Sequence, residues 1–442
     1  MADERDPRAE FLEAAVWHGS LERAAAILAE HPEIASGDIY TAAVLGDDAA
    51  VRRFLAADPK LATAKSGAHG WEPLSYLCLS KYLRLDPARS DGFVRAATAL
   101  LDAGADANTG FWTTGEHPEF ETALYGAAGV AHHPELTRLL LERGADPNDV
   151  EVAYHAPESD DNRALQLVVQ TGKLTADSLA TMLLRKADWH DLDGARWLLE
   201  HGADPNRLTN WRFSALHQAL RRDNDLAIVE AMLDHGADPA LPNGVDGRTA
   251  ISIAVRRGRA DALDLFERRG IRIALEGVER LIAACARNDS TGVRAITGTE
   301  PHLVQQLLAE GGTLLAEFAG TANAAGVAQL LDLGVDVQAP YAGDGYFGIA
   351  KNSTALHVAA WRAWPAVVQL LIERGALLDL PDGNGRTPLA LAVRACVGSY
   401  WSYRRSPESV EALLRAGASP YSVRIPSGYD AVDALIAAAR GS

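Results

Sequence analysis

The sequence predicts an all-α solenoid, a stack of antiparallel helix pairs, and three observations lead to that prediction. Segment 353–376 has the pattern of two short helices joined by a turn. The two halves of that pattern recur in alternation along the chain. One pair cannot bury both of its apolar faces alone, so it requires neighbours stacked on either side. A solenoid also accommodates 442 residues without one large core, because each repeat contacts only its neighbours.

Segment 353–376 carries the start and stop signals of both helices. Thr354 is a capping residue for the first helix, and the alanines that follow keep that helix thin. Pro365 suits the first turn of the second helix, where its missing N–H removes no hydrogen bond. Gly375 favours the left-handed conformation that ends a helix. Two short antiparallel helices are therefore predicted here.

Two signatures carry the repeat. Variants of the first-helix signature T-A-L-H-V-A-A begin at Thr122, Ser214, Thr249, Thr354 and Thr387. Variants of the helix exit G-A-D-P-N begin at Gly104, Gly144, Gly202, Gly236, Gly334, Gly375 and Gly417. In alternation they resemble the ankyrin repeat, whose first helix opens T-P-L-H-x-A and whose unit has about 33 residues. The resemblance covers nearly the whole chain and implies an ankyrin-repeat solenoid that acts as an interaction module.

In chain order, the prediction is one solenoid of about eleven helix pairs with extended finger loops, the loops that join one unit to the next. Its predicted parts are atypical N-terminal capping repeats at 1–66, repeats with insertions at 67–275, a degenerate repeat at 276–310, and C-terminal repeats with a cap at 311–442, all within a single solenoid over 1–442. The caps are atypical because one side of a terminal repeat faces water. An extra helix is expected at 164–171, where the gap between Gly144 and Gly202 exceeds one unit.

Composition excludes several classes of partner. Lys and Arg total 42 against 59 Asp and Glu, a formal charge of −17, so the basic stripe of a nucleic-acid binder is not expected. No apolar run approaches the ~18 residues of a membrane span, and the charged first residues are not those of a signal peptide. Three widely spaced cysteines suit a buried structural role and a reducing cytoplasm.

The functional information is expected in four finger segments, 110–121, 151–162, 207–213 and 338–353. They hold nine of the 29 aromatic residues in 47 of the 442 positions, nearly three times the average density. Loops at a surface have little to bury aromatic rings against. Rings at the edge of a groove supply binding energy in interfaces and pockets. The alternative is that these rings pack finger on finger and stiffen the edge of the solenoid.

The candidate binding residues are the aromatic and polar side chains of these fingers. They are Phe111, Trp112, His117, Glu119, Tyr154, His155, Asp161, Trp211, Arg212, Tyr341, Asp344, Tyr346, Phe347 and Lys351. Acids beside Trp and Tyr can hold a cationic group by charge and by cation–π attraction. The expected function is therefore binding of a protein partner along the concave groove, with a basic segment as one option. Solvated acidic loops are the alternative reading of the same charges.

A small-molecule site or an enzyme is the rival function. His117, Glu119, Tyr154, His155 and Asp161 lie on adjacent fingers and are able to converge as an acid–base set. No G-x-S-x-G or H-E-x-x-H motif is present, and no catalytic residue, cofactor or metal is assigned. Gly343, Gly345 and Gly348 match G-x-G-x-x-G outside any βαβ unit, so they are read as turn glycines.

Three further motifs are given structural roles. His217 and His357 occupy the histidine of T-P-L-H, which the resemblance implies is a hydrogen-bonded link between repeats. His132-His133 lies at a helix–helix turn without a third metal ligand at a suitable spacing. Asp382-Gly-Asn-Gly-Arg is the D-x-x-G-R turn of a finger, without the glutamate of a calcium loop or the lysine of a P-loop.

Overall fold

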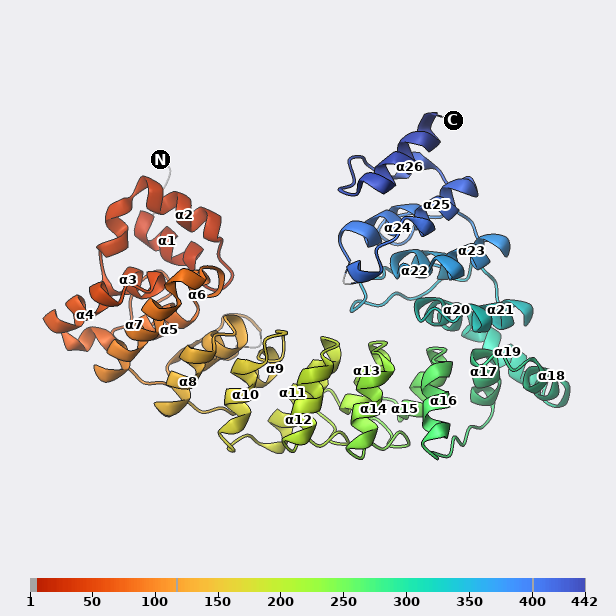
Figure 1. Cartoon of the computed structure of the whole chain (residues 1–442), viewed down its shortest axis with the longest axis horizontal. Coiled ribbons are helices and arrows are strands. Elements are labelled where there is room, and N and C mark those ends of the chain that lie inside the picture. The colour runs from red at the N-terminus through yellow and green to blue at the C-terminus, as the bar shows by residue number, and fades with distance from the viewer. Residues whose placement is uncertain (1–5, 117, 400, 442) are drawn as a thin grey trace. The chain divides into compact units, whose positions relative to one another are not determined.

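The computed structural model describes residues 6–116, 118–399 and 401–441. The chain forms two compact units. Unit 1 comprises Met1–Asp238 with Asn243–Val245, and unit 2 comprises Pro239–Pro242 with Asp246–Ser442. Each unit is a stack of short antiparallel helices, and Figure 1 labels them in chain order. The all-α repeat architecture is confirmed, and the prediction of one continuous solenoid stays a prediction.

Unit 1 builds two parallel rows of helices. Its elements are α1 (Pro7–Ala15), α2 (Leu21–Glu30), η1 (Pro32–Ser36), α3 (Ile39–Leu45), α4 (Asp48–Ala57), η2 (Pro59–Thr63), α5 (Pro73–Cys78), α6 (Lys81–Leu85), η3 (Pro87–Arg89), α7 (Ser90–Asp102), β1 (Gly110–Trp112), β2 (Phe120–Thr122), η4 (Tyr125–Val130), α8 (Pro134–Glu142), α9 (Val150–His155), α10 (Arg163–Gln170), α11 (Ala176–Asp188), α12 (Leu192–Glu200), α13 (Ala215–Arg221) and α14 (Leu226–Asp234). First helices pack in the order α3, α5, η4, α9, α11 and α13, while α8 packs on α7 and α10, and α12 packs on α14.

Unit 2 continues the same scheme. Its elements are α15 (Ala250–Arg256), α16 (Ala260–Arg268), α17 (Val278–Ala286), α18 (Ser290–Thr299), α19 (His302–Ala309), α20 (Gly311–Gly320), α21 (Ala324–Asp332), α22 (Ala355–Trp361), α23 (Pro365–Glu373), α24 (Pro388–Val397), η5 (Ser402–Arg404), α25 (Glu408–Arg415), η6 (Pro420–Ser422) and α26 (Asp430–Gly441). First helices α20, α22 and α24 pack in a row, second helices α21, α23 and α25 form the other, and α26 closes on α25.

The helix pair predicted at 353–376 is confirmed as α22 and α23. Thr354 and His357 cap α22 reciprocally, with the Thr354 N–H donating to His357 Nδ1 at 3.0 Å. The other ring nitrogen, Nε2, lies 2.8 Å from the carbonyl oxygen of Leu380 in the following finger. Gly375 has a φ of +82°, the left-handed value expected after α23. The T-P-L-H histidine thus ties one repeat to the next finger.

The asparagine of the G-A-D-x-N signature supplies a second tie between repeats. Asn148 donates from Nδ2 to the carbonyl of Lys173 at 3.0 Å and accepts the Thr175 N–H on Oδ1 at 2.8 Å. Asn108 bonds the corresponding groups of Gly144 and Asp146. Each side chain therefore satisfies two backbone groups of the unit that follows it.

The interpretation of 151–162 as a finger loop is wrong in its first half. Residues Val150–His155 form helix α9, whose N-terminus is capped by Asp149 through a 2.8 Å bond from the Glu151 N–H. α9 packs on η4 and α11, in the row of first helices, and α10 packs on α8, in the other row. The helix expected at 164–171 is α10 (Arg163–Gln170).

Candidate functional site

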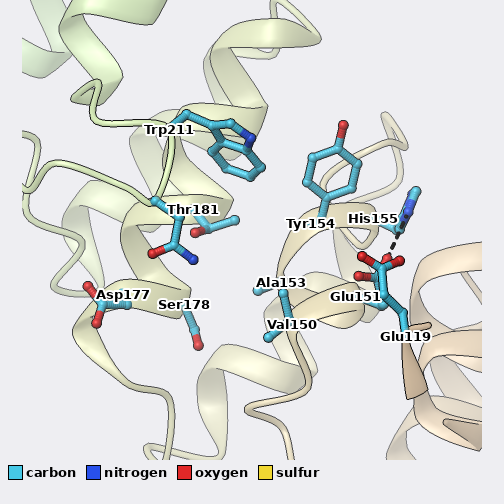
Figure 2. A pocket seen from close by; sticks show the side chains of 11 residues that line it. Glu119, Val150, Glu151, Ala153, Tyr154, His155, Asp177, Ser178, Thr181 and Trp211 are labelled. Atoms are coloured by element: carbon cyan, nitrogen blue, oxygen red, sulfur yellow. Dashed lines mark ion pairs between the residues drawn. The ribbon is translucent and has the colours of Figure 1, made fainter. Parts of the chain in front are cut away.

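A pocket of about 450 Å³ opens on unit 1 beside the finger 110–121. It is lined by Glu119, Val150, Glu151, Ala153, Tyr154, His155, Asp177, Ser178, Thr181, Asn210 and Trp211. These residues come from the segment preceding β2, from α9, from the start of α11 and from the finger before α13 (Figure 2). No Lys or Arg is among the described residues that line the pocket. Its lining is acidic and aromatic.

The finger 110–121 is a β-hairpin that sets the first wall. Strands β1 and β2 pair antiparallel, with Phe111 opposite Glu121 and Trp112 opposite Phe120. Side chains alternate between the faces of a strand, so Glu121 points to the same side as Phe111. Phe111 stacks on Trp71 at 3.9 Å between ring centroids, which anchors the hairpin on unit 1. Glu121 is consequently turned inward and is only 4% exposed.

Helix α9 supplies the second wall and the charged centre of the site. Glu151, Tyr154 and His155 lie within little more than one turn, which brings Glu151 and His155 onto one face at i and i+4. Gly129 of η4 allows close packing, because a Cβ there would lie 2.9 Å from the Cβ of His155. Tyr125 of η4 contacts the same imidazole, at 5.3 Å between ring centroids.

His155 is held between two carboxylates. Its Nε2 lies 3.3 Å from Glu151 Oε2, and its Nδ1 lies 3.0 Å from Glu158 Oε2. Burial lowers the pKa of His155, but the hydrogen bonds with Glu151 and Glu158 outweigh burial and raise it to about 9. The imidazole is therefore positively charged at neutral pH and holds both acids in place.

Arg185 of α11 covers one face of Tyr154. Its guanidinium lies 4.0 Å from the centroid of the Tyr154 ring, and it also forms ion pairs with Glu158 and Asp188. On the other side of the pocket, Trp211 lies 5.5 Å from Tyr154 between centroids and is 45% exposed. Figure 2 shows both rings directed into the same space. Trp211 thus presents the accessible aromatic surface of the pocket.

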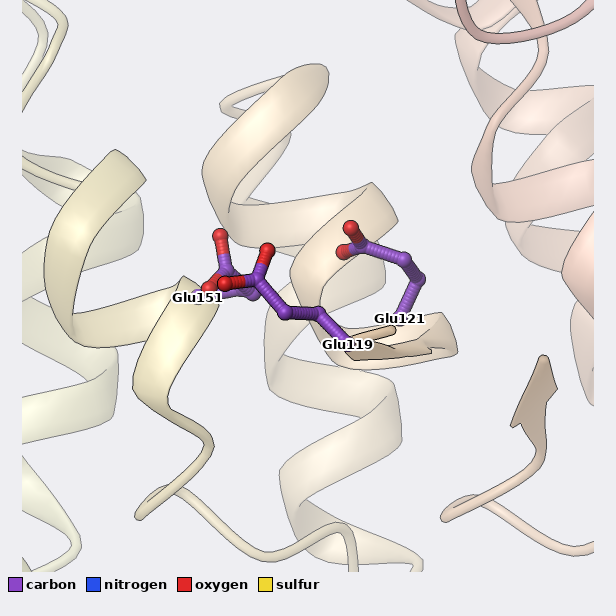
Figure 3. A group of neighbouring side chains, drawn as sticks. All are labelled: Glu119, Glu121 and Glu151. Atoms are coloured by element: carbon purple, nitrogen blue, oxygen red, sulfur yellow. The ribbon is translucent and has the colours of Figure 1, made fainter. Parts of the chain in front are cut away.

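Three carboxylates meet at the pocket edge. Oxygen atoms of Glu119, Glu121 and Glu151 all lie within 4.8 Å of one another. In Figure 3, Glu121 extends from β2 and Glu119 from the residue before β2, while Glu151 comes from α9. Burial raises the pKa of Glu121 to about 7, and the charges of Glu151, Asp149 and Glu119 add to that rise. Placing three acids together is electrostatically unfavourable without a positive partner.

The structure brings four of the sequence-predicted residues together and places others elsewhere. Glu119, Tyr154, His155 and Trp211 line one pocket. Asp161 instead forms a two-oxygen ion pair with Arg163 on the surface. The acid–base set expected from the sequence therefore does not include Asp161 at the pocket.

The remaining candidates of unit 1 have separate roles. Phe111 is packed on Trp71. Trp112 is 66% exposed and Phe120 is 38% exposed, with their centroids 5.3 Å apart. Arg212 shapes the loop, donating its N–H to Thr209 and accepting that of Gly244 on its carbonyl oxygen. His117 lies outside the described residues.

The finger 338–353 of unit 2 differs from the expectation of exposed binding rings. Phe347 is 2% exposed and packs with Trp361 and Trp401 in a buried cluster, against which Tyr346 is partly buried. Tyr341 is buried and donates its O–H to Glu317 at 2.8 Å. Asp344 accepts the N–H groups of Tyr346 and Phe347, which closes the turn, and Lys351 is exposed. This finger folds inward because Phe347 meets Trp361 of α22 and Trp401, which lies in the turn just before η5.

From the sequence, Glu121 and Glu151 were counted among the polar residues of the fingers but were not selected as binding residues, and Asp177 and Asn210 were not considered. The available signal for Glu121 was its position between Phe120 and Thr122 in a strand-like segment that follows Phe111-Trp112. That signal is short, and only the pairing of β1 with β2 shows that Glu121 faces inward. Predicting that Glu151 faces the site would have required knowing that residues 150–155 form a helix.

The stacked helix pairs and their finger loops define a helical repeat protein. A model of ankyrin repeats in three copies matches residues 183–276, and a model of the single ankyrin repeat matches residues 351–383. With the repeat signatures and the fold, these matches identify the chain as an ankyrin-repeat protein. In general terms, ankyrin repeats mark it as a protein–protein interaction module.

Three curated proteins are similar to this chain over part of their length. The chain is 28% identical to human ankyrin repeat and SOCS box protein 16 over 52% of this chain and 43% of that protein. It is 27% identical to ankyrin repeat domain-containing protein SAT10 of Stachybotrys chartarum over 72% of this chain and 14% of that protein. It is 36% identical to serine/threonine-protein kinase 12 of Arabidopsis thaliana over 19% of this chain and 17% of that protein. The chain thus spans less than half the length of each of these relatives.

One solved structure with similarity is the ankyrin repeat domain of human ASB11. It is 24% identical, with a TM-score of 0.24, and the match covers 54% of this chain and 98% of that chain. Within the described part of this chain, every helix is too short or too polar to cross a membrane.

Proposed function

We propose that the chain binds a protein partner through the pocket of unit 1 and that a lysine or arginine of a basic segment enters it. The observation that carries the proposal is the combination of exposed Trp211 with acidic walls in a pocket whose described lining contains no Lys or Arg. A cation over an aromatic face is attracted by the ring quadrupole, and nearby carboxylates add Coulomb attraction.

The charges of the pocket are unevenly compensated. Asp177 forms a 2.6 Å ion pair with Arg207, and Glu151 contacts His155. Among the described residues, the exposed carboxylate of Glu119 has no ion-pair partner. An incoming guanidinium or ammonium would lie between Glu119 and Trp211, which face the pocket from opposite sides (Figure 2).

Arg185 and Tyr154 show the arrangement that we propose for the ligand, a guanidinium lying over an aromatic ring. The guanidinium of Arg185 already stacks on Tyr154 within this wall. The same chemistry on the free surface of Trp211 requires no rearrangement of the backbone. The exposed pair of Trp112 and Phe120 on the adjacent hairpin supplies apolar surface for the residues that flank the cation.

The test is selection of peptides against the full chain from a random display library. We expect enrichment of Lys or Arg at one position of the selected peptides. Trp211→Ala is expected to weaken binding of a selected peptide by about tenfold, the loss typical of an aromatic anchor. Trp189→Ala is the matched control, because Trp189 is 44% exposed and does not line the pocket. Selected peptides without the basic position, or equal affinities for both variants, would contradict the proposal.

A small cationic molecule is the second candidate ligand. The observation in its favour is the pocket volume of about 450 Å³, which lies within the range of about 300–1,000 Å³ found for small-molecule sites. Thermal-shift measurements with arginine, agmatine and spermidine test it, with Trp211→Ala as the variant that should abolish any response. The three free, buried cysteines support a reducing compartment such as the cytoplasm as the setting for either ligand.

A further inference from the structure

We propose that Glu119, Glu121 and Glu151 form a binding site for one Ca²⁺ ion at the edge of the pocket. The site consists of three carboxylates from two separate elements, the end of the β-hairpin and the first turn of α9. It is independent of the peptide proposal in its evidence, although the two share Glu119 and Glu151.

The spacing of the oxygen atoms fits a single ion. Ligand oxygens lie about 2.3–2.6 Å from Ca²⁺, so two oxygens on opposite sides of the ion are about 4.6–5.2 Å apart. The three carboxylates each place an oxygen within 4.8 Å of the other two. One Ca²⁺ can therefore contact all three side chains without a change in the backbone. Carboxylate oxygens with water in the remaining positions are the ligands that Ca²⁺ prefers, and Glu119 leaves the site open to water.

Glu121 supplies an observation independent of the clustering. The residue is only 4% exposed, and its Oε2 atom has no hydrogen-bond partner in the described structure. A buried polar atom without a partner costs free energy, and a buried carboxylate costs more. That carboxylate points toward Glu119 and Glu151 (Figure 3). A cation between the three acids would complete the coordination that Glu121 lacks.

Of the positive groups nearby, His155 pairs with one acid of the cluster, Glu151, and Arg185 pairs only with acids outside it. Both ring nitrogens of His155 face carboxylates, one of Glu151 and one of Glu158. Arg185 contacts Glu158 and Asp188. Asp149, an acid outside the cluster of three, accepts a hydrogen bond from the Thr122 hydroxyl. Among the described residues, Glu119 and Glu121 therefore have no ion-pair partner, and a Ca²⁺ ion bound by all three acids would supply one.

Calcium titration of the metal-free full chain, followed by calorimetry and by the unfolding temperature, tests the proposal. We expect one Ca²⁺ per chain and a rise in unfolding temperature with Ca²⁺ concentration. Glu121→Gln removes the buried charge and keeps the shape, and it is expected to weaken Ca²⁺ binding by about tenfold or more. Glu116→Gln is the control, an exposed acid of the same hairpin outside the cluster.

The outcomes separate loss of the site from loss of the fold. Glu121→Gln without Ca²⁺ should unfold at a temperature equal to or above that of the wild type, because it removes an uncompensated buried charge. Wild type that shows no calorimetric binding in millimolar Ca²⁺, or equal binding by the Glu121→Gln and Glu116→Gln variants, would overturn the calcium site. Trp211→Ala should bind Ca²⁺ as the wild type does, so failure of the peptide proposal and failure of the calcium site are distinguishable.

Discussion

Asn206 holds the repeat that follows it by two hydrogen bonds, donating from Nδ2 to the carbonyl oxygen of Gly236 at 2.8 Å and accepting the Asp238 N–H on Oδ1 at 2.7 Å. Asn206→Ala should lower the free energy of unfolding by about 1–3 kcal/mol, because both backbone groups lose their partner. Urea unfolding monitored by circular dichroism measures the change. Glu200→Ala, at an exposed position of α12, should change stability by less than about 0.5 kcal/mol. Equal effects of the two substitutions would show that the asparagine tie contributes nothing.

The pair of Lys186 and Asp191 should be sensitive to removal of one partner. Lys186 has no exposed surface, and its Nζ lies 2.7 Å from Asp191 Oδ2 and 2.9 Å from the carbonyl oxygen of Ser159. Burial lowers the pKa of Lys186, and the Asp191 carboxylate opposes that fall. Asp191→Ala is expected to cost about 3–5 kcal/mol, since it leaves a buried ammonium without its counter-charge. Chemical denaturation should show partial recovery when Lys186→Met is added, and no recovery would argue against the charge explanation.

Stability should fall in mild acid because of His132. Burial lowers the pKa of His132 to about 4, with the charge of Arg84 adding to the effect. The unfolded chain binds a proton at this position near pH 6.5, whereas the folded chain does so only near pH 4, so protonation favours unfolding between these values. From pH 6.5 to pH 5 the loss should reach up to about 2 kcal/mol.

His132→Asn separates this contribution from those of other titrating groups. Asn tolerates the positive φ of +50° at position 132 and carries no titrating group. The difference in unfolding temperature between pH 7 and pH 5 should therefore be smaller for the variant than for the wild type. An identical pH dependence for the two proteins would exclude His132 as the origin.

Phe347 should matter for stability and Trp112 should not. Phe347 is 2% exposed in the cluster with Trp361 and Trp401, so Phe347→Ala is expected to cost about 3–5 kcal/mol. Trp112 is 66% exposed, and Trp112→Ala should change stability by less than about 0.5 kcal/mol. Denaturation midpoints of the two variants check this contrast. If both were equally mild, the finger 338–353 would not be part of the core.

The helix pairs were predictable because their signals are local. Thr354, Pro365 and Gly375 act within one or two turns of their own positions, and the structure confirms each as a boundary of α22 or α23. Helix α9 was not predictable in this way. It has only two buried residues, Val152 and Ala153, and its packing on η4 and α11 stabilises a segment too short to signal a helix alone.

The candidate site was predicted in part, for a similar reason. The enrichment of aromatic residues pointed to the fingers, and Tyr154 and Trp211 do line the pocket. The same enrichment did not distinguish Phe347, whose burial depends on Trp401, more than fifty positions later in the chain. Nor did it reveal Glu121, whose inward direction depends on which residue of β1 it pairs with. The enrichment of aromatic residues therefore pointed to the finger segments. Which of their side chains are exposed depends on contacts with residues far away in the sequence, and composition does not reveal these contacts.

In the described part of unit 1, the amide hydrogens bound by three asparagine side chains would report on how neighbouring repeats separate. Asn108, Asn148 and Asn206 accept the amide hydrogens of Asp146, Thr175 and Asp238, respectively. Each of these hydrogens exchanges with solvent only when the tie between two neighbouring repeats opens. Comparing the exchange rates of the three amide hydrogens would therefore show whether unfolding begins at one end of the stack of repeats or between repeats in its middle.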